Sequence, residues 1–154
     1  MGWVKPARIL PEIMTTSEHI KNRLRNIWSD LQFIWPTNPN WGLDVERWLS
    51  RIIENCSVRH YVFTNGIWEC ENYAHQFKAN VENYQYQLYQ SGEFKPKWRW
   101  AIGESIGIKS DIFGNAVVHG MNIIITESRV LVYEPQEDTY LENNYEYIPF
   151  FIKF

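Results

Sequence analysis

The segment Ala116-Val117-Val118-His119-Gly120-Met121-Asn122-Ile123-Ile124-Ile125 decides the fold, together with the segment Arg129-Val130-Leu131-Val132-Tyr133-Glu134-Pro135-Gln136 that soon follows it. Both runs are rich in β-branched residues, which favour strands. They predict strands over residues 117–125 and 129–133, joined as a hairpin. An imidazole and a carboxylate interrupt these apolar strands, and local inconsistencies of this kind gather at functional sites.

The predicted hairpin places His119 and Glu134 on the same face of the sheet. If Thr126 and Glu127 form the turn, His119 lies directly opposite Glu134, with Cβ atoms about 5 Å apart. A four-residue loop shifts the partner by two positions and keeps the shared face, whereas an odd-length loop separates the two side chains. A carboxylate beside an imidazole fixes its tautomer and stabilises the imidazolium. The alternatives are a core histidine that bonds a backbone carbonyl and a glutamate that faces solvent before Pro135.

Apolar residues recur with helical spacing before these strands, and the alternation typical of strands begins after Gly92. The patterns predict helices over residues 18–34, 44–55 and 70–90, a short strand over 61–63, and strands near 98–102 and 145–154. Pro149 predicts an edge or a bulge in the last strand, and residues 1–14 predict an irregular arm. Helices followed by consecutive antiparallel strands predict one α+β domain over residues 1–154, with the helices packed on an antiparallel sheet.

The chain contains two cysteines, and their positions differ in kind. Cys56 falls on the apolar stripe of the second helix, which predicts a buried core residue. Cys70 stands where the third helix begins, and the exposed N–H groups and dipole of a helix start favour the nucleophilic thiolate. A structural thiol that begins the apolar face of this helix is the alternative. Without an export signal, a Cys56–Cys70 disulfide is not expected.

The stretch Trp68-Glu69-Cys70-Glu71-Asn72-Tyr73-Ala74 resembles the nucleophile helix of transglutaminase-like and papain-like proteins. His119-Gly120-Met121-Asn122, followed by Tyr133-Glu134-Pro135-Gln136, resembles the cysteine-protease domain of the Marasmius agglutinin-related family, in which a Cys, a His and the Glu of an EPQ motif form the triad. Tyr147-Ile148-Pro149-Phe150 and Ile9-Leu10-Pro11-Glu12 resemble small phage and bacterial members of that group.

This resemblance implies a papain-like fold with Cys70, His119 and Glu134 as the triad. It implies a cysteine hydrolase that acts on peptide or amide bonds through an acyl-enzyme, and the same groups would also serve transamidation. The sugar-binding trefoil that accompanies the domain in the agglutinin has no room in 154 residues, which argues against lectin activity. The alternatives are a catalytically silent binding module, for example a phage accessory or inhibitor protein, and a structural domain with all three residues in its core.

Five further residues are candidates for supporting roles. Asn65 is the nearest side-chain amide before Cys70 and is a candidate hydrogen-bond donor to the oxyanion. A plain Asn65-Gly66 turn is the alternative. Gln136 shares its face with Glu134 and could bond within the site. Trp68 and Trp98 are candidates for lining a substrate groove, with core packing as the alternative. Asn122 has the opposite parity to His119, which predicts a backbone-supporting role on the other face.

Charge and hydropathy exclude several classes of function. The net charge is -3 and basic residues are scattered, which argues against nucleic acid as a partner. No apolar run is long enough for a membrane span and no signal peptide is evident, so a cytoplasmic protein is expected. The resemblance implies a phage-related protein with a peptide or protein substrate. The histidines lack metal-ligand spacing, and the acidic group Asp111, Glu134, Glu137 and Asp138 reads more simply as a solvated turn than as a cation site. No metal or cofactor is expected.

Overall fold

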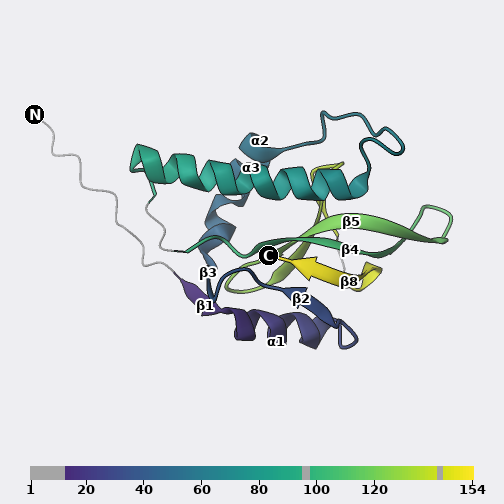
Figure 1. Cartoon of the computed structure of the whole chain (residues 1–154), viewed down its shortest axis with the longest axis horizontal. Coiled ribbons are helices and arrows are strands. Elements are labelled where there is room, and N and C mark those ends of the chain that lie inside the picture. The colour runs from purple at the N-terminus through teal and green to yellow at the C-terminus, as the bar shows by residue number, and fades with distance from the viewer. Residues whose placement is uncertain (1–12, 95–97, 142–143) are drawn as a thin grey trace, which may run out of the picture.

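The computed structural model describes residues 13–94, 98–141 and 144–154, and it has a six-stranded sheet with helices on both faces (Figure 1). The elements in chain order are β1 (Met14–Thr16), α1 (Ser17–Ile27), β2 (Phe33–Trp35), β3 (Asn40–Gly42), the 3-10 helix η1 (Asp44–Trp48), α2 (Leu49–Cys56), α3 (Cys70–Ser91), β4 (Ile102–Ser110), β5 (Ala116–Ile125), β6 (Val130–Glu134), β7 (Thr139–Tyr140), the 3-10 helix η2 (Asn144–Glu146) and β8 (Tyr147–Lys153). The strand order is β2-β8-β4-β5-β6-β7, and β1 pairs separately with β3. The α+β class predicted from the sequence is confirmed.

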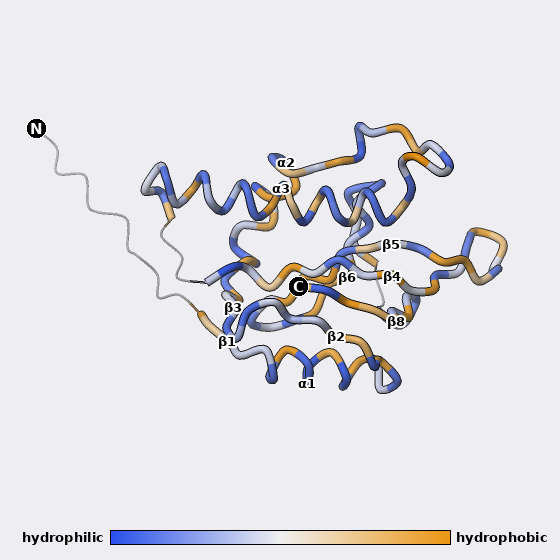
Figure 2. Tube along the Cα trace, in the orientation of Figure 1, coloured by the Kyte–Doolittle hydropathy of each residue, from blue (hydrophilic) through white to orange (hydrophobic). Residues whose placement is uncertain are grey.

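The second half of β5 is buried on both faces of the sheet, which explains the apolar run Ile123-Ile124-Ile125. Ile123 and Ile125 face one core with residues of α1, whereas Ile124 faces a second core with residues of α2 and α3. In Figure 2 the hydropathy of α1 alternates along the tube, as expected of a helix with one buried side. The helices therefore cover both faces, with α1 opposite α3.

The first predicted helix, over residues 18–34, is too long. α1 ends at Ile27, and Trp28 leaves the helical path, with its indole N–H donating to the Tyr147 carbonyl at 2.8 Å. Residues 33–35 instead form β2, which pairs in parallel with β8 through Ile34 and Ile152. Leu31 and Ile34 pack on the same core as α1, so their helical spacing reflects shared burial and not a shared helix.

Two strand predictions also need correction. Residues 61–63 form no strand: their side chains are exposed, and the local pairing is a single bridge between Thr64 and Trp68. The last strand is not an edge strand, because β8 lies between β2 and β4. Its register against β4 shifts beside Pro149, so of the two expectations for this proline the bulge is correct. Residues 1–12 of the predicted irregular arm lie outside the described residues.

Three predicted elements are confirmed, and their ends are close to the predicted ones. The helix predicted over 70–90 is α3, which begins at Cys70, and the helix predicted over 44–55 is η1 followed by α2. β5 and β6 form the hairpin predicted over residues 117–133. They pair antiparallel over a stretch that begins at Asn122 in β5 and at Val130 in β6. Because α3 packs on β4 and β5, the start of this helix lies against the middle of the sheet.

Candidate functional site

His119 and Glu134 form a charged pair inside the sheet. The ring nitrogen Nε2 of His119 hydrogen-bonds Oε2 of Glu134. Glu134 is 2 % exposed, and its other oxygen accepts the backbone N–H of Gln136 at 3.2 Å. A buried carboxylate needs such partners, because desolvation would otherwise disfavour its charge. Because Nε2 bonds the carboxylate, Nδ1 is the ring nitrogen that could exchange a proton with another group.

A two-residue turn would have made the two residues direct cross-strand partners, but in the structure they are not. Ile125 pairs with Val130 and Asn122 with Tyr133, so the connecting loop holds the four residues 126–129. Thr126 closes this loop, since its side-chain oxygen accepts the Arg129 N–H at 3.0 Å. The partner position therefore shifts by two, and His119 reaches Glu134 diagonally from the same face.

Cys70 is the first residue of α3, and its side chain lies close enough to the His119 ring to help raise the pKa of the imidazole. Its sulfur also lies 3.5 Å from Oε2 of Glu71. The helix start is capped by Asn72, whose side-chain oxygen accepts the Glu69 N–H at 2.9 Å, while the Glu69 carboxylate accepts the Gly66 N–H at 2.6 Å. The structure thus brings together the three residues that the sequence singled out.

The ionisation of the pair follows from its surroundings. Burial of the His119 ring lowers its pKa, but the hydrogen bonds to Cys70 and Glu134 and the charges of both partners outweigh this and raise the pKa to about 9. Burial alone would raise the pKa of Glu134, but the bonds to His119 and Gln136 and the Lys109 charge bring it below its ordinary value. At neutral pH an imidazolium therefore lies between the thiol and a carboxylate.

Three residues that the sequence did not single out help to build this site. Lys109 Nζ lies 3.4 Å from Oε2 of Glu134, opposite the imidazole. Gly120 lets the helix start approach β5: a Cβ atom there would lie 2.8 Å from the Cα and N atoms of Glu71. Glu71 itself flanks the sulfur. A glycine inside an apolar strand marks a close backbone approach, and this signal could have identified Gly120.

The supporting candidates divide into those near the site and those elsewhere. Gln136 contacts Glu134 through its backbone N–H. Asn65 is exposed, precedes Gly66 at φ 72°, and forms the turn that was its alternative role. Asn122 confirms its prediction: it is fully buried on the other face, and its amide donates to the Ala74 carbonyl at 2.8 Å, tying α3 to the sheet.

The two tryptophans proposed for a substrate groove are packed into the fold. Trp68 stacks on Tyr61 with ring centroids 4.4 Å apart and meets the edge of Tyr73. The Trp98 carbonyl accepts the Gln85 amide at 3.1 Å, beside the far half of α3. Fifteen helical residues separate Gln85 from Cys70, or about 22 Å along the axis. Trp98 is therefore no groove residue for this site, a correction to the sequence-based prediction.

The remaining titratable candidates are used elsewhere. Cys56 is a fully buried free thiol whose pKa burial raises to about 12, as its place on the apolar stripe predicted. Asp138 accepts hydrogen bonds from Tyr133 and Ser57, and Asp111 bonds its own turn, so the acidic residues do not converge. In the part of the chain that the structure describes, no cluster of His, Cys, Asp and Glu could hold a metal ion. Among the same residues no helix is long and apolar enough to cross a bilayer.

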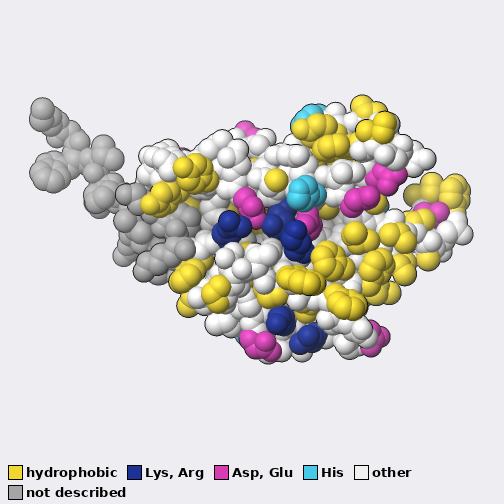
Figure 3. Space-filling model, in the orientation of Figure 1, with side chains coloured by type: hydrophobic (Ala, Val, Ile, Leu, Met, Phe, Trp, Pro, Cys, Tyr) yellow, Lys and Arg dark blue, Asp and Glu magenta, His cyan; other side chains and the backbone are white. Residues whose placement is uncertain are grey.

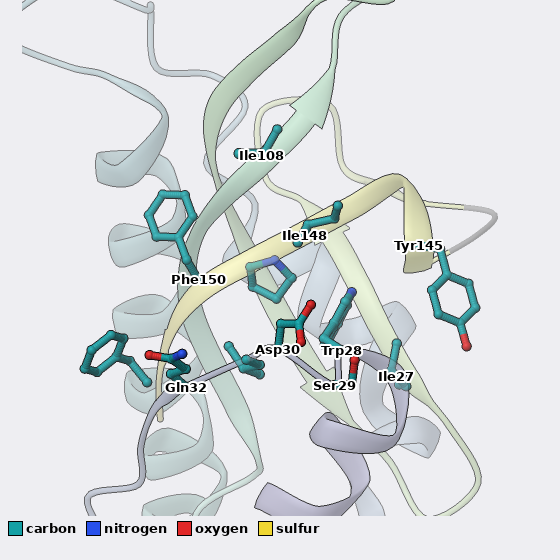
Figure 4. Close-up of a pocket in the computed structure, with 12 residues that line it drawn as sticks. Ile27, Trp28, Ser29, Asp30, Gln32, Ile108, Tyr145, Ile148 and Phe150 are labelled. Carbon is teal, nitrogen blue, oxygen red and sulfur yellow. The ribbon is translucent and has the colours of Figure 1, made fainter.

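A pocket of about 480 Å³ lies away from the three residues, between the segment after α1 and the outer side of β8 (Figure 4). Trp28, Ile108, Ile148 and Phe150 contribute to its lining, and Asp30 lies among them. A smaller hollow of about 260 Å³ adjoins the first turns of α3, where His75 bonds Glu104 at 2.8 Å. Neither is lined by Cys70, His119 or Glu134.

Comparison with known proteins shows similarity of fold. No protein-family model and no curated protein matches the sequence. The PSL1a–E64 complex matches 92% of this chain with a TM-score of 0.71 and 19% identity. A Polyporus squamosus lectin bound to the human-type influenza-binding epitope Neu5Acα2-6Galβ1-4GlcNAc matches 92% of it with a TM-score of 0.70 and 21% identity. The chain spans about half the length of either protein, 50% and 49%.

These comparisons correct the sequence-based classification. The terms cysteine peptidase, thiol protease, hydrolase and phage-related were expected to describe the chain. One of the solved structures that it resembles is a lectin with a bound glycan, and neither structure is described as a peptidase or a phage protein. What the comparisons establish is a mixed α+β chain whose fold resembles part of a carbohydrate-binding lectin.

Proposed function

We propose that Cys70, His119 and Glu134 cleave amide bonds of a peptide or protein through an acyl-thioester on Cys70. The observation that carries this proposal is the His119 ring, which hydrogen-bonds a buried carboxylate and lies near a thiol at the start of a helix. The proposal concerns the chemistry of the site and not the classification of the chain. A nucleophile on a helix that faces a base on a strand is also the papain-like arrangement of the Marasmius agglutinin-related family that the sequence resembles.

The charges of the site suit the first chemical step. His119 is protonated at neutral pH, and in the proposed step the sulfur of Cys70 attacks as thiolate beside this imidazolium. The sulfur adds to the amide carbon, and the developing oxyanion lies near the N–H groups of the first turn of α3. His119 Nδ1 then protonates the departing amine, which leaves the acyl group on Cys70.

Release of the acyl group uses the same residues in reverse. The imidazole, now neutral, takes a proton from water, and the resulting hydroxide adds to the thioester carbon. The sulfur then departs as thiolate while His119 keeps the proton, which frees the acid and restores the starting pair. Glu134 keeps the ring oriented throughout and stabilises the imidazolium each time it forms. An amine in place of water would give transamidation with no change in these residues.

Alkylation with iodoacetamide tests the activated thiol, with Cys56 as an internal control. Cys70 should be labelled rapidly at pH 7, while Cys56 stays unlabelled because it is buried and its pKa is about 12. His119→Ala should slow labelling by about tenfold or more, because the thiolate loses its cationic partner. The epoxide E64, the compound named with PSL1a, and cleavage of a denatured protein provide second readouts. Equally slow labelling of both cysteines would overturn the proposal.

Glycan binding is the second candidate, because one structural neighbour is a lectin with a bound glycan. The chain spans 49% of that protein, so the glycan contacts of the neighbour are not thereby assigned to this part of it. Titration with Neu5Acα2-6Galβ1-4GlcNAc, followed by NMR or calorimetry, tests this function. Saturable binding that Cys70→Ala leaves intact would favour a binding module; no binding at millimolar glycan would leave the amide-bond chemistry as the function to pursue.

A further inference from the structure

The first residues of β5 form an open apolar edge that leads directly into His119. β5 pairs with β4 along its whole length, from Ala116 to Ile124, but β6 joins it only from Asn122 onward. Within the described residues, no other strand pairs with β5 before that point. Val117 is 37% and Val118 65% exposed. Proteins usually protect such an edge with charge or proline, and residues 116–118 have neither.

The start of α3 lies against β5 at the inner end of this edge. A Cβ atom on Gly120 would lie 2.8 Å from the backbone of Glu71 and 2.9 Å from the carbonyl carbon of Cys70, so the first residues of the helix cover the face of the strand at that point. His119 is the next residue toward the open end, and it lies close enough to Cys70 for the two side chains to interact. A chain segment laid along residues 116–119 therefore passes the sulfur and the imidazole.

Apolar side chains flank the edge on two sides. Figure 3 shows hydrophobic side chains gathered over the loop between α2 and α3 and over the tip of the β4–β5 hairpin, with acidic side chains between them. The loop contributes Val62, Phe63 and Ile67, of which Ile67 is 77% exposed, and the hairpin tip contributes Ile112 and Phe113. Exposed apolar groups concentrated in this way mark an interaction surface.

We propose that the site takes extended, apolar polypeptide segments, which bind by adding a strand to the free edge of β5. This inference rests on the proposed function, since it names the substrate of the same residues. Main-chain hydrogen bonds supply affinity in strand addition, and side chains that alternate along the added strand contact the flanking groups. Val118 and Ile67 then select apolar residues next to the scissile amide, because they are the exposed apolar side chains nearest in sequence to His119 and Cys70.

Competition between small and peptide-based alkylating agents tests this substrate class. The rate of alkylation by iodoacetamide reports the reactivity of the thiolate alone. Two peptidyl chloromethyl ketones of equal length are compared with it, one with the sequence Val-Val-Ala and one with Ser-Gly-Asn. Their alkylation rates also depend on how well each peptide binds along the free edge of β5. The apolar peptide should alkylate Cys70 about tenfold faster than the polar peptide, the effect of burying about one valine side chain. Each rate is divided by the iodoacetamide rate of the same variant.

Exposed positions supply matched variants. Val118→Ser and Ile67→Ser should each reduce the apolar preference severalfold, whereas Ile148→Ser, at an exposed apolar residue of β8, should leave it unchanged. Thermal unfolding confirms that each variant is folded. Equal normalised rates for the two peptides in the native chain would overturn the inference even if iodoacetamide labels Cys70 rapidly. Slow labelling by iodoacetamide itself would overturn the proposed function, and the inference with it.

Discussion

The protonation of His119 depends on Glu134, and removing that charge should change the pH range over which Cys70 reacts. In Glu134→Gln the burial of the ring still lowers the pKa of His119, while the largest nearby charge that raises it is gone. The pKa should therefore fall from about 9 toward or below its ordinary value. Iodoacetamide rates measured from pH 5 to 10 should reach their rapid value only at a higher pH than in the native chain, because a neutral imidazole no longer favours the thiolate.

A second histidine–glutamate pair, between His75 of α3 and Glu104 of β4, provides the control. His75 bonds Glu104 at 2.8 Å but is 70% exposed, so Glu104→Gln removes a comparable contact away from the sulfur. Its alkylation profile should match that of the native chain. An unchanged profile in Glu134→Gln, or an equal change in both variants, would show that the carboxylate does not govern the imidazole.

The contact between α3 and β5 sets the distance from sulfur to imidazole, and Gly120 makes that contact possible. In Gly120→Ala the new methyl group would meet the backbone of Glu71 at 2.8 Å and of Cys70 at 2.9 Å. Backbone cannot move aside as a flexible side chain does, so the helix start must shift, at a cost of about 1–3 kcal/mol in the free energy of unfolding. Chemical denaturation and Cys70 alkylation should both report the change.

Gly103→Ala separates lost stability from a misplaced nucleophile. Its Cβ would lie 3.0 Å from a methyl group of Ile152 and 3.2 Å from the Lys153 carbonyl, both on the neighbouring strand β8. It should destabilise the chain while leaving the alkylation rate of Cys70 unchanged. If Gly120→Ala alkylates at the native rate, the close approach serves packing alone.

Local signals predicted the elements that carry the site, and non-local pairing accounts for the errors. α3 and β5 are long and strongly periodic, so their spacing identified them. β2 was missed because its partner, β8, lies at the other end of the chain, and three residues carry no pattern of their own. Parity placed His119 and Glu134 on one face, but the hydrogen bonds of Thr126 fixed the loop length and hence the register.

The misplacement of Trp98 has the same origin. Its apolar, aromatic character suits either a groove or a core, and only the length of α3 shows that it lies far from Cys70. Lys109 was not singled out because nothing in its own strand distinguishes it from a solvent-facing lysine. Its relevance comes from the neighbouring carboxylate of Glu134, which a reading of one strand at a time does not supply.

Over the whole molecule, one sheet serves two cores, and the site lies where β5 and β6 separate. The two solved structures share this fold at TM-scores of 0.71 and 0.70, although about four in five aligned residues differ. A fold hosts more than one function, so the comparison constrains the scaffold while the residues around His119 carry the argument for chemistry. Measurements of stability report on both the scaffold and the chemistry, because the charged pair of the site lies within the sheet.

The free energy of unfolding should depend on pH through this pair, with a sign that its two pKa values determine. The pKa of His119 is raised from 6.5 to about 9, so its stabilising contribution is complete below pH 6.5 and is lost as the pH rises through about 9. The pKa of Glu134 is lowered from 4.5, so its contribution is complete above pH 4.5 and is lost as the pH falls through the lowered value. Urea unfolding should therefore show the largest difference between the native chain and Glu134→Gln between pH 4.5 and 6.5, with the difference shrinking steadily toward pH 9. Glu104→Gln, which removes an exposed pair, should show no such trend. A difference that grows between pH 7 and 9 would mean that the imidazole is neutral in the folded chain, and the thiolate–imidazolium pair would then have no support.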